Sequence, residues 1–564
     1  MRKITTTAFV LLAANLFYAQ VGINTANPQA TLDISGSGTN PTKGLLVPRL
    51  TSTEILAMSQ QNALGSQQNS LIVFATTTTS TGDFVTSKIT QPGFYRYTYD
   101  GSNAFQQYWK RMEPSAFERI AQGGKTGIRL IDADIQKYGL IGSNAIDASF
   151  SNQTTSFHGA TGDNSFAAGI NTFSSGIAST AFGNDTEALG NGSFAGGQDT
   201  RSVGLNSFAY GENSEANNIN SVAFGKTNNN LGINSSILAG RNNKITNSFN
   251  SAVLSGNNNT INYTGTSADD WPNNYNGVAN NILGGHTNSI TGSVSLTINT
   301  IVGGINNLIN ETRYSVIGGG AGNKIKPAVA PYDQPYYSSN IIAGGEGNEI
   351  NADKSVIGGG DRNLIRLEGT AQYPQGAGMS TISGGQFNNI INNAHFSAVV
   401  GGRGNSTKGS YSIVGGASNV AQSVAEVSLG LFGTLYTPQY PNAYTFNGTW
   451  SNDLALSKDR LFNIGNGKAP SNFDFQGDVV TGSPLAVRSD AFTILKNGQV
   501  GIDIDNFETN TSTAKLQING GIKLSANSTA LSGNSCDNTN RGQIIFVEDN
   551  FYGCKSTGWA LLNN

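Results

Sequence analysis

The sequence predicts an all-β chain whose main body is a parallel β-roll, or β-solenoid, of about sixteen coils, with small β-rich modules at both ends. Two observations predict this class. A short phrase recurs at a fixed step in the middle of the chain, and each repeat divides into two short extended pieces. Glycine supplies 71 of 564 residues and charged residues only 12%, a composition that suits thin coils with small side chains inside.

The phrase runs from Ser165 to Gly169 and starts again every 14 residues for five copies, the last beginning at Ser221. A Ser or Thr recurs at the eighth place and a Gly at the twelfth, so each half is expected to end at a residue that tolerates positive φ. Two strands and two tight turns then make one coil. A helix is a poor alternative because each interior Gly costs about 1 kcal/mol.

Apolar residues at the second and third places of the phrase are expected to fill the core of the coil or a core between chains. The predicted core residues are Phe166, Ala167, Ala181, Phe194, Ala195, Phe208, Ala209, Val222 and Ala223.

The phrase continues in a looser form as far as Tyr411–Gly415, with steps of 14 to 29 residues. Loop-like insertions explain the wider steps. A Gly-x-x-Asn-x-Ile echo, as in Gly320–Ile325, is expected to supply the second strand of these later coils.

The Ser-Phe-Ala-x-Gly repeat resembles the head of YadA-type trimeric autotransporter adhesins, specifically over 165–232 and more weakly over 236–435. The resemblance implies a left-handed parallel β-roll built from three chains that binds host matrix or other surfaces. The family's membrane barrel and coiled-coil stalk are not visible in this sequence, so self-translocation is not implied.

Residues 1–20 are expected to form a secretory signal peptide, because a positive start precedes an apolar run of about ten residues and a small-residue exit. This run is shorter than the roughly 20 residues that span a membrane. No later segment is expected to span one.

Residues 21–118 are predicted to form a β-rich module with one short helix, Ser52–Met58, capped by Ser52 or Thr53. A phrase of Val-Gly-Ile followed by Leu-x-Ile opens this module and recurs at 500–518. It resembles segments of phage tail-fibre proteins and of Bacteroidetes-type secreted proteins.

The β-roll is assigned to 119–435, an irregular connector with a β-hairpin to 436–522, and a small β-module to 523–564. The last module repeats the strand pattern of residues 70–110. Its two cysteines, Cys536 and Cys554, are expected to form a disulfide, since an even pair in an exported chain most simply does so.

Composition and motifs argue against several functions. A net charge of −3 gives no footprint for nucleic acid. The three histidines are scattered, and no catalytic, cofactor-binding or metal-binding residues are assigned. Residues 401–408 superficially resemble a phosphate loop and 358–361 a calcium-binding roll, but both are interpreted as turns of the repeat.

Large aromatic residues in the insertions are candidate ligand contacts, since they lie on loops. These candidates are Trp271, Tyr332, Tyr336, Tyr337 and Tyr373. A ladder of Thr172, Thr186 and Thr200 could bind ice or polysaccharide, or serve only hydrogen bonding within the coil.

The sequence therefore predicts a secreted or surface-bound adhesin or fibre component. Its expected partners are two further copies of the chain and a surface protein or glycan. One alternative is a phage tail-fibre-like receptor-binding protein. Another is a polysaccharide-active enzyme on a β-solenoid, which would need paired Asp or Glu residues in a cleft.

Overall fold

The structure is a computed structural model that confirms the all-β class, and it divides into two compact units, residues 1–116 and 117–564. Each unit is described by itself. The described residues are 21–23, 32–34, 45–60, 64, 66–78, 86, 89, 92–99, 108–112, 116–131, 133–153, 157–265, 277–293, 296–327, 339–367, 378–392, 394–440, 457–469, 487–524, 536–547 and 549–562. The predicted signal peptide lies outside them.

The first unit contains a two-stranded parallel sheet and a four-stranded sheet of order β3-β4-β5-β6, next to which helix α2 (Ser52–Gln60) packs. The strands are β1 (Val21–Ile23), β2 (Leu32–Ile34), β3 (Arg49–Leu50), β4 (Ile72–Ala75), β5 (Gly93–Thr98) and β6 (Tyr108–Arg111), with a 3-10 turn η2 (Ser66–Gln68). The cap of α2 is Thr51, not Ser52 or Thr53: Glu54 N donates to Thr51 Oγ1 at 3.2 Å, and Thr51 N donates to Glu54 Oε2 at 2.7 Å. This reciprocal pair is a capping box.

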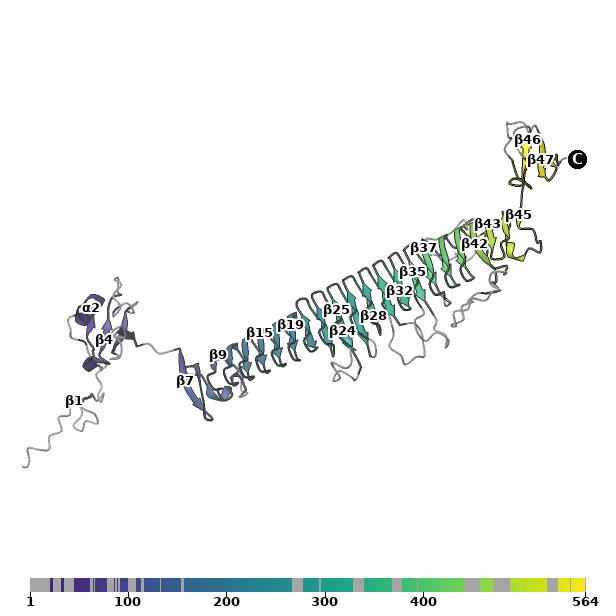
Figure 1. The fold of residues 1–564 in the computed structure, drawn as a ribbon. Helices are drawn as coiled ribbons and strands as arrows, with labels where there is room; N and C mark the ends of the chain where they lie inside the picture. The colour runs from purple at the N-terminus through teal and green to yellow at the C-terminus, as the bar shows by residue number, and fades with distance from the viewer. Residues whose placement is uncertain are drawn as a thin grey trace, which may run out of the picture. The chain divides into compact units, whose positions relative to one another are not determined.

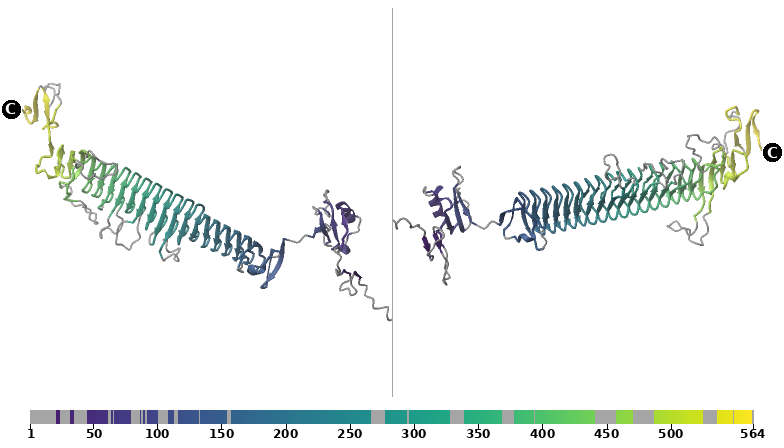
Figure 2. Two further views of the ribbon diagram at one scale, coloured as in Figure 1. Left: turned by 180° about the vertical axis from the view of Figure 1, so that it is seen from behind. Right: turned by 90° about the horizontal axis from the view of Figure 1, so that it is seen from below.

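The second unit is dominated by the predicted solenoid, whose coils stack along one axis (Figures 1 and 2). One side, which we call the A sheet, begins with β7 (Phe117–Gln122), β8 (Lys125–Leu130) and β9 (Ile146–Phe150), where β7 and β8 form an antiparallel hairpin. The 3-10 turn η4 (Ile135–Lys137) lies between β8 and β9.

From β9 onward the A sheet takes every second strand of the chain, each parallel to the last. These strands are β11 (Phe166–Ile170), β13 (Thr180–Asn184), β15 (Phe194–Gln198), β17 (Phe208–Glu212), β19 (Val222–Lys226), β21 (Ser236–Ile237), β23 (Ala252–Val253), β25 (Asn281–Ile282), β27 (Thr300–Ile301), β29 (Val316–Ile317), β31 (Ile341–Ile342), β33 (Val356–Ile357), β35 (Thr381–Ile382), β37 (Ala398–Arg403), β39 (Ile413–Ala417) and β41 (Val427–Leu431).

The other side of the solenoid, the B sheet, has sixteen parallel strands. They are β10 (Gly159–Ala160), β12 (Phe173–Ser174), β14 (Glu187–Ala188), β16 (Arg201–Ser202), β18 (Glu215–Ala216), β20 (Asn229–Leu231), β22 (Lys244–Thr246), β24 (Thr260–Tyr263), β26 (Ser289–Gly292), β28 (Leu308–Asn310), β30 (Lys324–Lys326), β32 (Glu349–Asn351), β34 (Leu364–Arg366), β36 (Asn389–Ile390), β38 (Ser406–Thr407) and β40 (Val420–Ala421).

The 14-residue period sets the register of the coils as predicted. Phe166 pairs with Thr180, and Thr180 pairs with Phe194, so Ser165, Ser179 and Ser193 form one column. The later coils are shifted by one residue relative to the phrase. Ala223 pairs with Ile237, so the residue that continues the serine column is Ser235 and not Ser236. One extra residue then lies between the buried position and the glycine of each coil.

The solenoid core changes along its length. In the first coils the inward column of the A sheet consists of alanines such as Ala181 and Ala195, with no exposed surface. From Ile237 onward both inward columns are mostly isoleucine, and these residues form one continuous cluster that extends to Ala421. The core is therefore thin at the start of the repeat and thicker beyond it.

The glycine column of the A sheet is required by close packing between coils. Gly183 has φ +128°, and a Cβ placed there would come within 2.0 Å of the carbonyl oxygen of Gly197 in the next coil. The glycines at the twelfth place, such as Gly190, differ from the expectation because they have no positive φ. They are needed because a Cβ at Gly190 would come within 2.0 Å of Gly204 O.

The solenoid has about 21 turns, more than the sixteen predicted. The count differs because the A sheet extends beyond the recognisable phrase at both ends. At the C-terminal end it continues through β42 (Arg460–Asn466), β43 (Asp490–Leu495), β44 (Val500–Ile502) and β45 (Leu516–Ile518), with a 3-10 turn η7 (Phe507–Thr509).

The repeated Val-Gly-Ile phrase forms the same structure in both units. Val21 pairs with Leu32 in the parallel strands β1 and β2. Val500 pairs with Leu516 in the parallel strands β44 and β45. The phrase is thus a small two-strand element that closes the solenoid at its C-terminal end.

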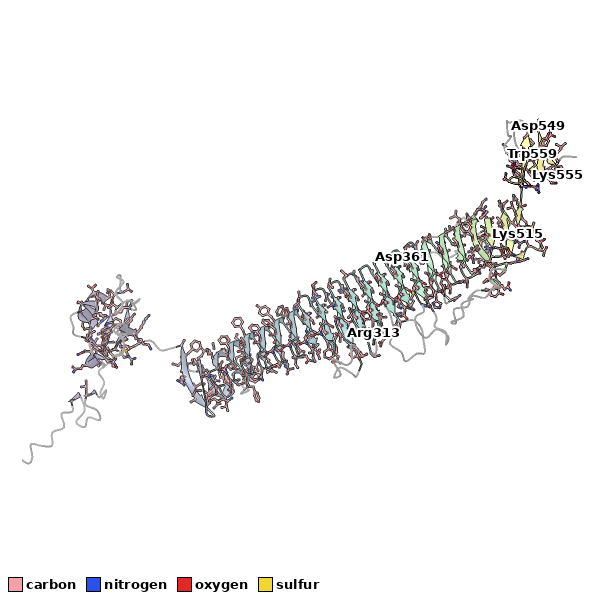
Figure 3. The ribbon with its side chains drawn as sticks, viewed as in Figure 1. Arg313, Asp361, Lys515, Asp549, Lys555 and Trp559 are labelled. Atoms are coloured by element: carbon pink, nitrogen blue, oxygen red, sulfur yellow. A yellow bond between two sulfur atoms is a disulfide. The ribbon has the colours of Figure 1, made fainter. Side chains whose placement is uncertain are left out.

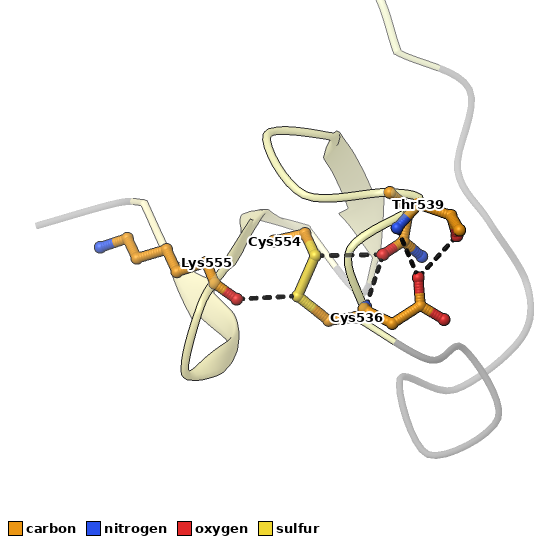
Figure 4. Close-up of a disulfide and its surroundings, with 6 residues drawn as sticks. Cys536, Thr539, Cys554 and Lys555 are labelled. Carbon is orange, nitrogen blue, oxygen red and sulfur yellow. Dashed lines mark hydrogen bonds between the residues drawn. A yellow bond between two sulfur atoms is a disulfide. The ribbon is translucent and has the colours of Figure 1, made fainter.

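The C-terminal module is an antiparallel sheet of β46 (Ile544–Val547), β47 (Asn550–Lys555) and β48 (Gly558–Leu561). The expected disulfide joins Cys536 to Cys554 (Figure 4). Asp537 organises the loop beside it, since its Oδ1 accepts from Thr539 N at 2.8 Å. The bridge therefore fixes this loop to the central strand of the module.

Candidate interaction surface

The outer side of the A sheet carries two uncharged rows of mostly apolar residues, which together we call the A face. Successive residues of a strand point to opposite sides, so the buried Ala167 places Phe166 and Ala168 outside. The first outward row is Ile146, Phe166, Thr180, Phe194, Phe208, Val222, Ser236, Ala252, Asn281, Thr300, Val316, Ile341, Val356, Thr381, Ala398, Ile413, Val427 and Phe462. None of these residues is charged.

The second outward row is equally uncharged. Its large members are exposed in the single chain, with 54% of Phe182, 52% of Tyr210 and 47% of Leu238 accessible. Other exposed members are Leu254, Leu283, Val302 and Val400. An uncharged, mostly apolar surface of this length marks an interaction site.

The A face and the core vary in opposite directions along the solenoid. Where the core is alanine, the A face is aromatic, and Phe194 stacks on Phe208 with ring centroids 4.3 Å apart. Where the core is isoleucine, the outer rows contain smaller residues such as Leu254 and Val302. Coils with little apolar burial inside thus have the most apolar surface available for a partner.

The outer face of the B sheet, the B face, carries charged residues. Charges also lie at the strand ends of the A sheet, outside the A face, where Lys226 Nζ lies 2.7 Å from Glu212 Oε1. On the B face, two ion pairs join neighbouring coils. Arg201 Nε lies 3.0 Å from Glu187 Oε2 on the preceding coil, and Lys326 Nζ lies 3.3 Å from Glu349 Oε1 on the following one. Both pairs are substantially exposed, so each contributes little to stability. Their effect is to make the B face suited to water.

A strained column of turn residues borders the A sheet. Ile298 and Met379 have φ of +53° and +59°, a conformation that is a genuine outlier for a β-branched side chain such as Ile298. About half of each side chain is exposed. Nearby, Phe396 stacks on Tyr411 with centroids 4.9 Å apart. This column adds apolar surface at one edge of the A face.

Two titratable groups are buried in the same edge of the solenoid. Burial raises the pKa of Asp353 to about 7, and the neighbouring Lys354 lowers it by less. Burial lowers the pKa of His395 to about 4. Within the described residues, Oδ1 of Asp353 has no hydrogen-bond partner.

The N-terminal end of the solenoid is closed by a buried ion pair. Arg129 Nε lies 2.8 Å from Asp147 Oδ2, and both side chains are almost fully buried. The guanidinium also donates to Gly139 O at 3.0 Å and lies over the ring of Tyr138. These contacts cover the first coil.

The C-terminal end is closed by a larger buried group. Arg460 Nη2 lies 2.9 Å from Glu508 Oε2 and 3.3 Å from Asp490 Oδ2. Burial lowers the pKa of Arg460, but these carboxylates together with Glu426 outweigh it and raise the pKa. Burial also raises the pKa of Glu426 and lowers that of Lys496. These carboxylates compensate cations inside the fold, which is a structural role.

The repeat-core residues separate into two sets. Ala167, Ala181, Ala195, Ala209 and Ala223 have no exposed surface and fill the coil. The other four, Phe166, Phe194, Phe208 and Val222, are half-buried and lie on the A face. The structure thus assigns the alanines to the core of the coil and the larger residues to its outside.

The threonine ladder is inside the solenoid. Thr172, Thr186 and Thr200 are at most 1% exposed, so they cannot contact ice or a polysaccharide. The aromatic loop candidates, Trp271, Tyr332, Tyr336, Tyr337 and Tyr373, lie outside the described residues.

The sequence analysis did not predict a buried asparagine ladder that continues the column of Thr172, Thr186 and Thr200. Asn307 Oδ1 accepts from Asn323 N at 3.0 Å, and Asn307 Nδ2 donates to Gly303 O and Gly320 O, both at 3.0 Å. The ladder comprises Asn228, Asn243, Asn259, Asn288, Asn307, Asn323, Asn348, Asn363, Asn388, Asn405 and Asn419. The Asn of the Gly-x-x-Asn-x-Ile echo was the available signal.

The part of the chain that the structure describes contains no helix long and apolar enough to cross a membrane, and no cluster of three or more His, Cys, Asp or Glu residues arranged to hold a metal ion.

A family model described as a phage tail-like trimerisation region matches residues 20–125. The match covers the first unit and reaches β7, the first strand of the A sheet. No curated protein matches the chain. The match together with the solenoid supports a fibre-like structural protein and a homotrimer.

Proposed function

We propose that the chain is an exported, homotrimeric, fibre-like protein in which three solenoids pack through their A faces and use their remaining surface to adhere to a surface protein or glycan. The A face carries this proposal, because two uncharged outward rows run from β9 to β42. A second copy offers an equally uncharged surface of the same length.

The other features agree with this arrangement. The trimerisation-region match includes β7, the strand at which the A sheet begins, and ends at the first residue of β8, so the A sheet follows that region directly along the chain. The charged B face would then be turned to solvent. The disulfide fits a protein made for an oxidising compartment outside the cytoplasm.

Charge placed on the A face tests the proposal. Light scattering of the mature chain should give the mass of a trimer. The trimer of the double variant Leu254→Glu with Leu283→Glu should dissociate at a higher protein concentration than the natural trimer does, because apolar contacts would be replaced by repelling carboxylates. The matched control is Thr260→Glu with Ser289→Glu on the B face of the same coils. A first variant that resists dilution as the natural chain does, or a control that dissociates as readily as the first variant, would refute the assigned interface.

We propose that the chain acts by binding and not by catalysis, as an adhesin. Glycan and matrix-protein arrays probed with the trimeric chain identify the ligand class. Turnover of a polysaccharide by the purified chain, lost on substitution of a paired Asp or Glu, would favour the enzymatic alternative.

The second candidate is a phage tail-fibre-like receptor-binding protein, favoured by the trimerisation-region match. Electron microscopy of particles from the producing cells distinguishes the two. Antibody labelling of tail-like particles supports the tail-fibre role, and labelling of the cell surface alone supports the adhesin.

A further inference from the structure

The C-terminal module repeats, strand for strand and in the same register, a part of the first unit. In both, three consecutive strands form an antiparallel sheet with the longest in the middle. The pairs in the first unit are Val73↔Tyr95, Phe74↔Phe94 and Tyr97↔Trp109, and those in the C-terminal module are Ile545↔Tyr552, Phe546↔Phe551 and Cys554↔Trp559. The Phe-Phe and central Trp positions coincide.

The backbone bonds around the two sheets also coincide. In the first unit Ser70 N donates to Tyr97 O, Leu71 N to Gln68 O, and Met112 N to Phe94 O. At the matching places Gly542 N donates to Cys554 O, Gln543 N to Asn540 O, and Leu562 N to Phe551 O. Ser70 and Gly542 share a positive φ, +77° and +91°. The two modules therefore share the same strand order, register and flanking backbone hydrogen bonds.

The two modules cover one face of this sheet differently. In the first unit α2 covers it, and Trp109 Nε1 donates to Ser59 Oγ of the helix at 3.1 Å. In the C-terminal module (Figure 3) Trp559 pairs with Cys554 as Trp109 pairs with Tyr97, so it lies on the corresponding face, and the Cys536–Cys554 bridge holds a loop at the position equivalent to Tyr97. The disulfide loop takes the place of the helix at this point.

The opposite face, here the outer face, is exposed in both modules. Phe94 is 49% and Phe551 38% exposed, although both are large apolar residues. Next to Phe94 the first unit has Arg96 and Lys110. The equivalent positions in the C-terminal module are Gly553 and Ala560.

The centre of the C-terminal outer face is thus apolar. It consists of Ile544, Phe546, Phe551, Gly553, Ala560 and Leu562, and the one charged side chain on this side of β47, Lys555, lies at the end of the strand. A centre without charge avoids repulsion against its own copy.

We propose that the C-terminal module is a second self-association module, whose outer face packs against the same face of the other copies of this chain. The partner of this face is inferred from the matching sheet β4-β5-β6, which has the same strand arrangement and lies within the trimerisation-region match. We therefore expect the partner to be another copy of this chain. This inference rests on the homotrimer of the proposed function. It adds a second point of association at the opposite end of the sequence.

Site-specific photo-crosslinking in the full mature chain tests the proposal. Phe551→p-benzoylphenylalanine keeps an aromatic ring on the outer face, and Thr557→p-benzoylphenylalanine places the same probe in the exposed turn between β47 and β48. Irradiation of dilute protein should give covalent dimers and trimers when the probe is at position 551. The same probe at position 557 should give none of these products.

A second variant separates contact from folding. Phe551→Asp, combined with the probe at Ile544, should abolish the covalent products, while mass measurement without reduction shows that the Cys536–Cys554 bridge still forms. A trimeric chain that gives no products from position 551 overturns this inference alone. A chain that is monomeric by light scattering overturns the proposed homotrimer.

Discussion

At the scale of single residues, some glycines of the solenoid are required by the backbone and others are not, and the neighbours Gly303 and Gly304 show the difference. Gly304 has φ +88°, and a Cβ there would come within 2.1 Å of Gly320 O. Its neighbour Gly303 has no positive φ and open space where a Cβ would be. Sequence alone cannot separate the two, because both belong to the same Gly-Gly dipeptide.

We therefore expect Gly304→Ala to destabilise the solenoid by on the order of 1–3 kcal/mol from backbone strain, with the clash adding to this. Gly303→Ala should leave stability unchanged or slightly raise it, because it reduces the freedom of the unfolded chain. Thermal unfolding followed by circular dichroism measures both. Equal midpoints would show that the neighbouring coil moves away without cost.

Asp353 should make stability depend on pH. Its raised pKa means that the neutral acid is favoured in the fold, so its contribution is complete below about pH 4 and is lost as the pH rises through about 7. A shift of this size corresponds to at most about 4 kcal/mol. Asp353→Asn should remove this dependence and be the more stable protein at pH 8. Urea unfolding at pH 5 and pH 8 measures the difference, and identical pH profiles would contradict it.

At the scale of elements, the coils are held in register by buried polar columns as well as by apolar ones. Asn307 forms hydrogen bonds to both neighbouring coils, through Asn288 and Asn323, and its Nδ2 also donates to Gly303 O within its own coil. Each buried group left without a partner costs about 1–3 kcal/mol. The ladder therefore specifies where each coil lies on the next.

Asn307→Ala should destabilise the solenoid by several kcal/mol, since it removes the partners of Asn323 N and Gly303 O and one of the two donors to Gly320 O. Asn310→Ala, on the outside of β28, is the matched control and should change stability little. Amide hydrogen exchange should show faster exchange at Asn323 in the first variant. Retained protection there would mean that water replaces the side chain.

The strands of the strict repeat could be predicted because period and alternation fix them: Ala167 and Ala181 pair where the 14-residue step places them. The strand β42 was not predicted because Arg460–Asn466 carries no Ser-x-Ala-x-Gly phrase, whereas β43 (Asp490–Leu495) lies in the region where a β-hairpin is expected. For the candidate surface, the sequence identified Phe194 and Phe208 as apolar positions. It could not say whether they lie inside, because alternation assigns faces only once the buried alanine column is known.

At the scale of the whole molecule, the core and the A face together predict which coils depend on association. An isoleucine in place of an alanine in an inward column buries about three more carbon groups, worth about 2 kcal/mol per position. The coils of β11 to β19 lack this contribution but carry Phe166, Phe194 and Phe208 on the A face. In these early coils, burial of the A face against other chains would supply the apolar stabilisation that the isoleucine core supplies in the later coils.

Dissociating the trimer should therefore melt the early coils first. In the Leu254→Glu, Leu283→Glu variant, amides of β11 to β19 should lose protection against hydrogen exchange, while amides of β23 to β39 keep theirs because the isoleucine core is intact. In the control Thr260→Glu, Ser289→Glu, the amides of both regions should be as protected against hydrogen exchange as in the natural chain. Uniform loss along the solenoid would show that all coils unfold as one unit, and uniform retention would show that the alanine coils are stable without a partner.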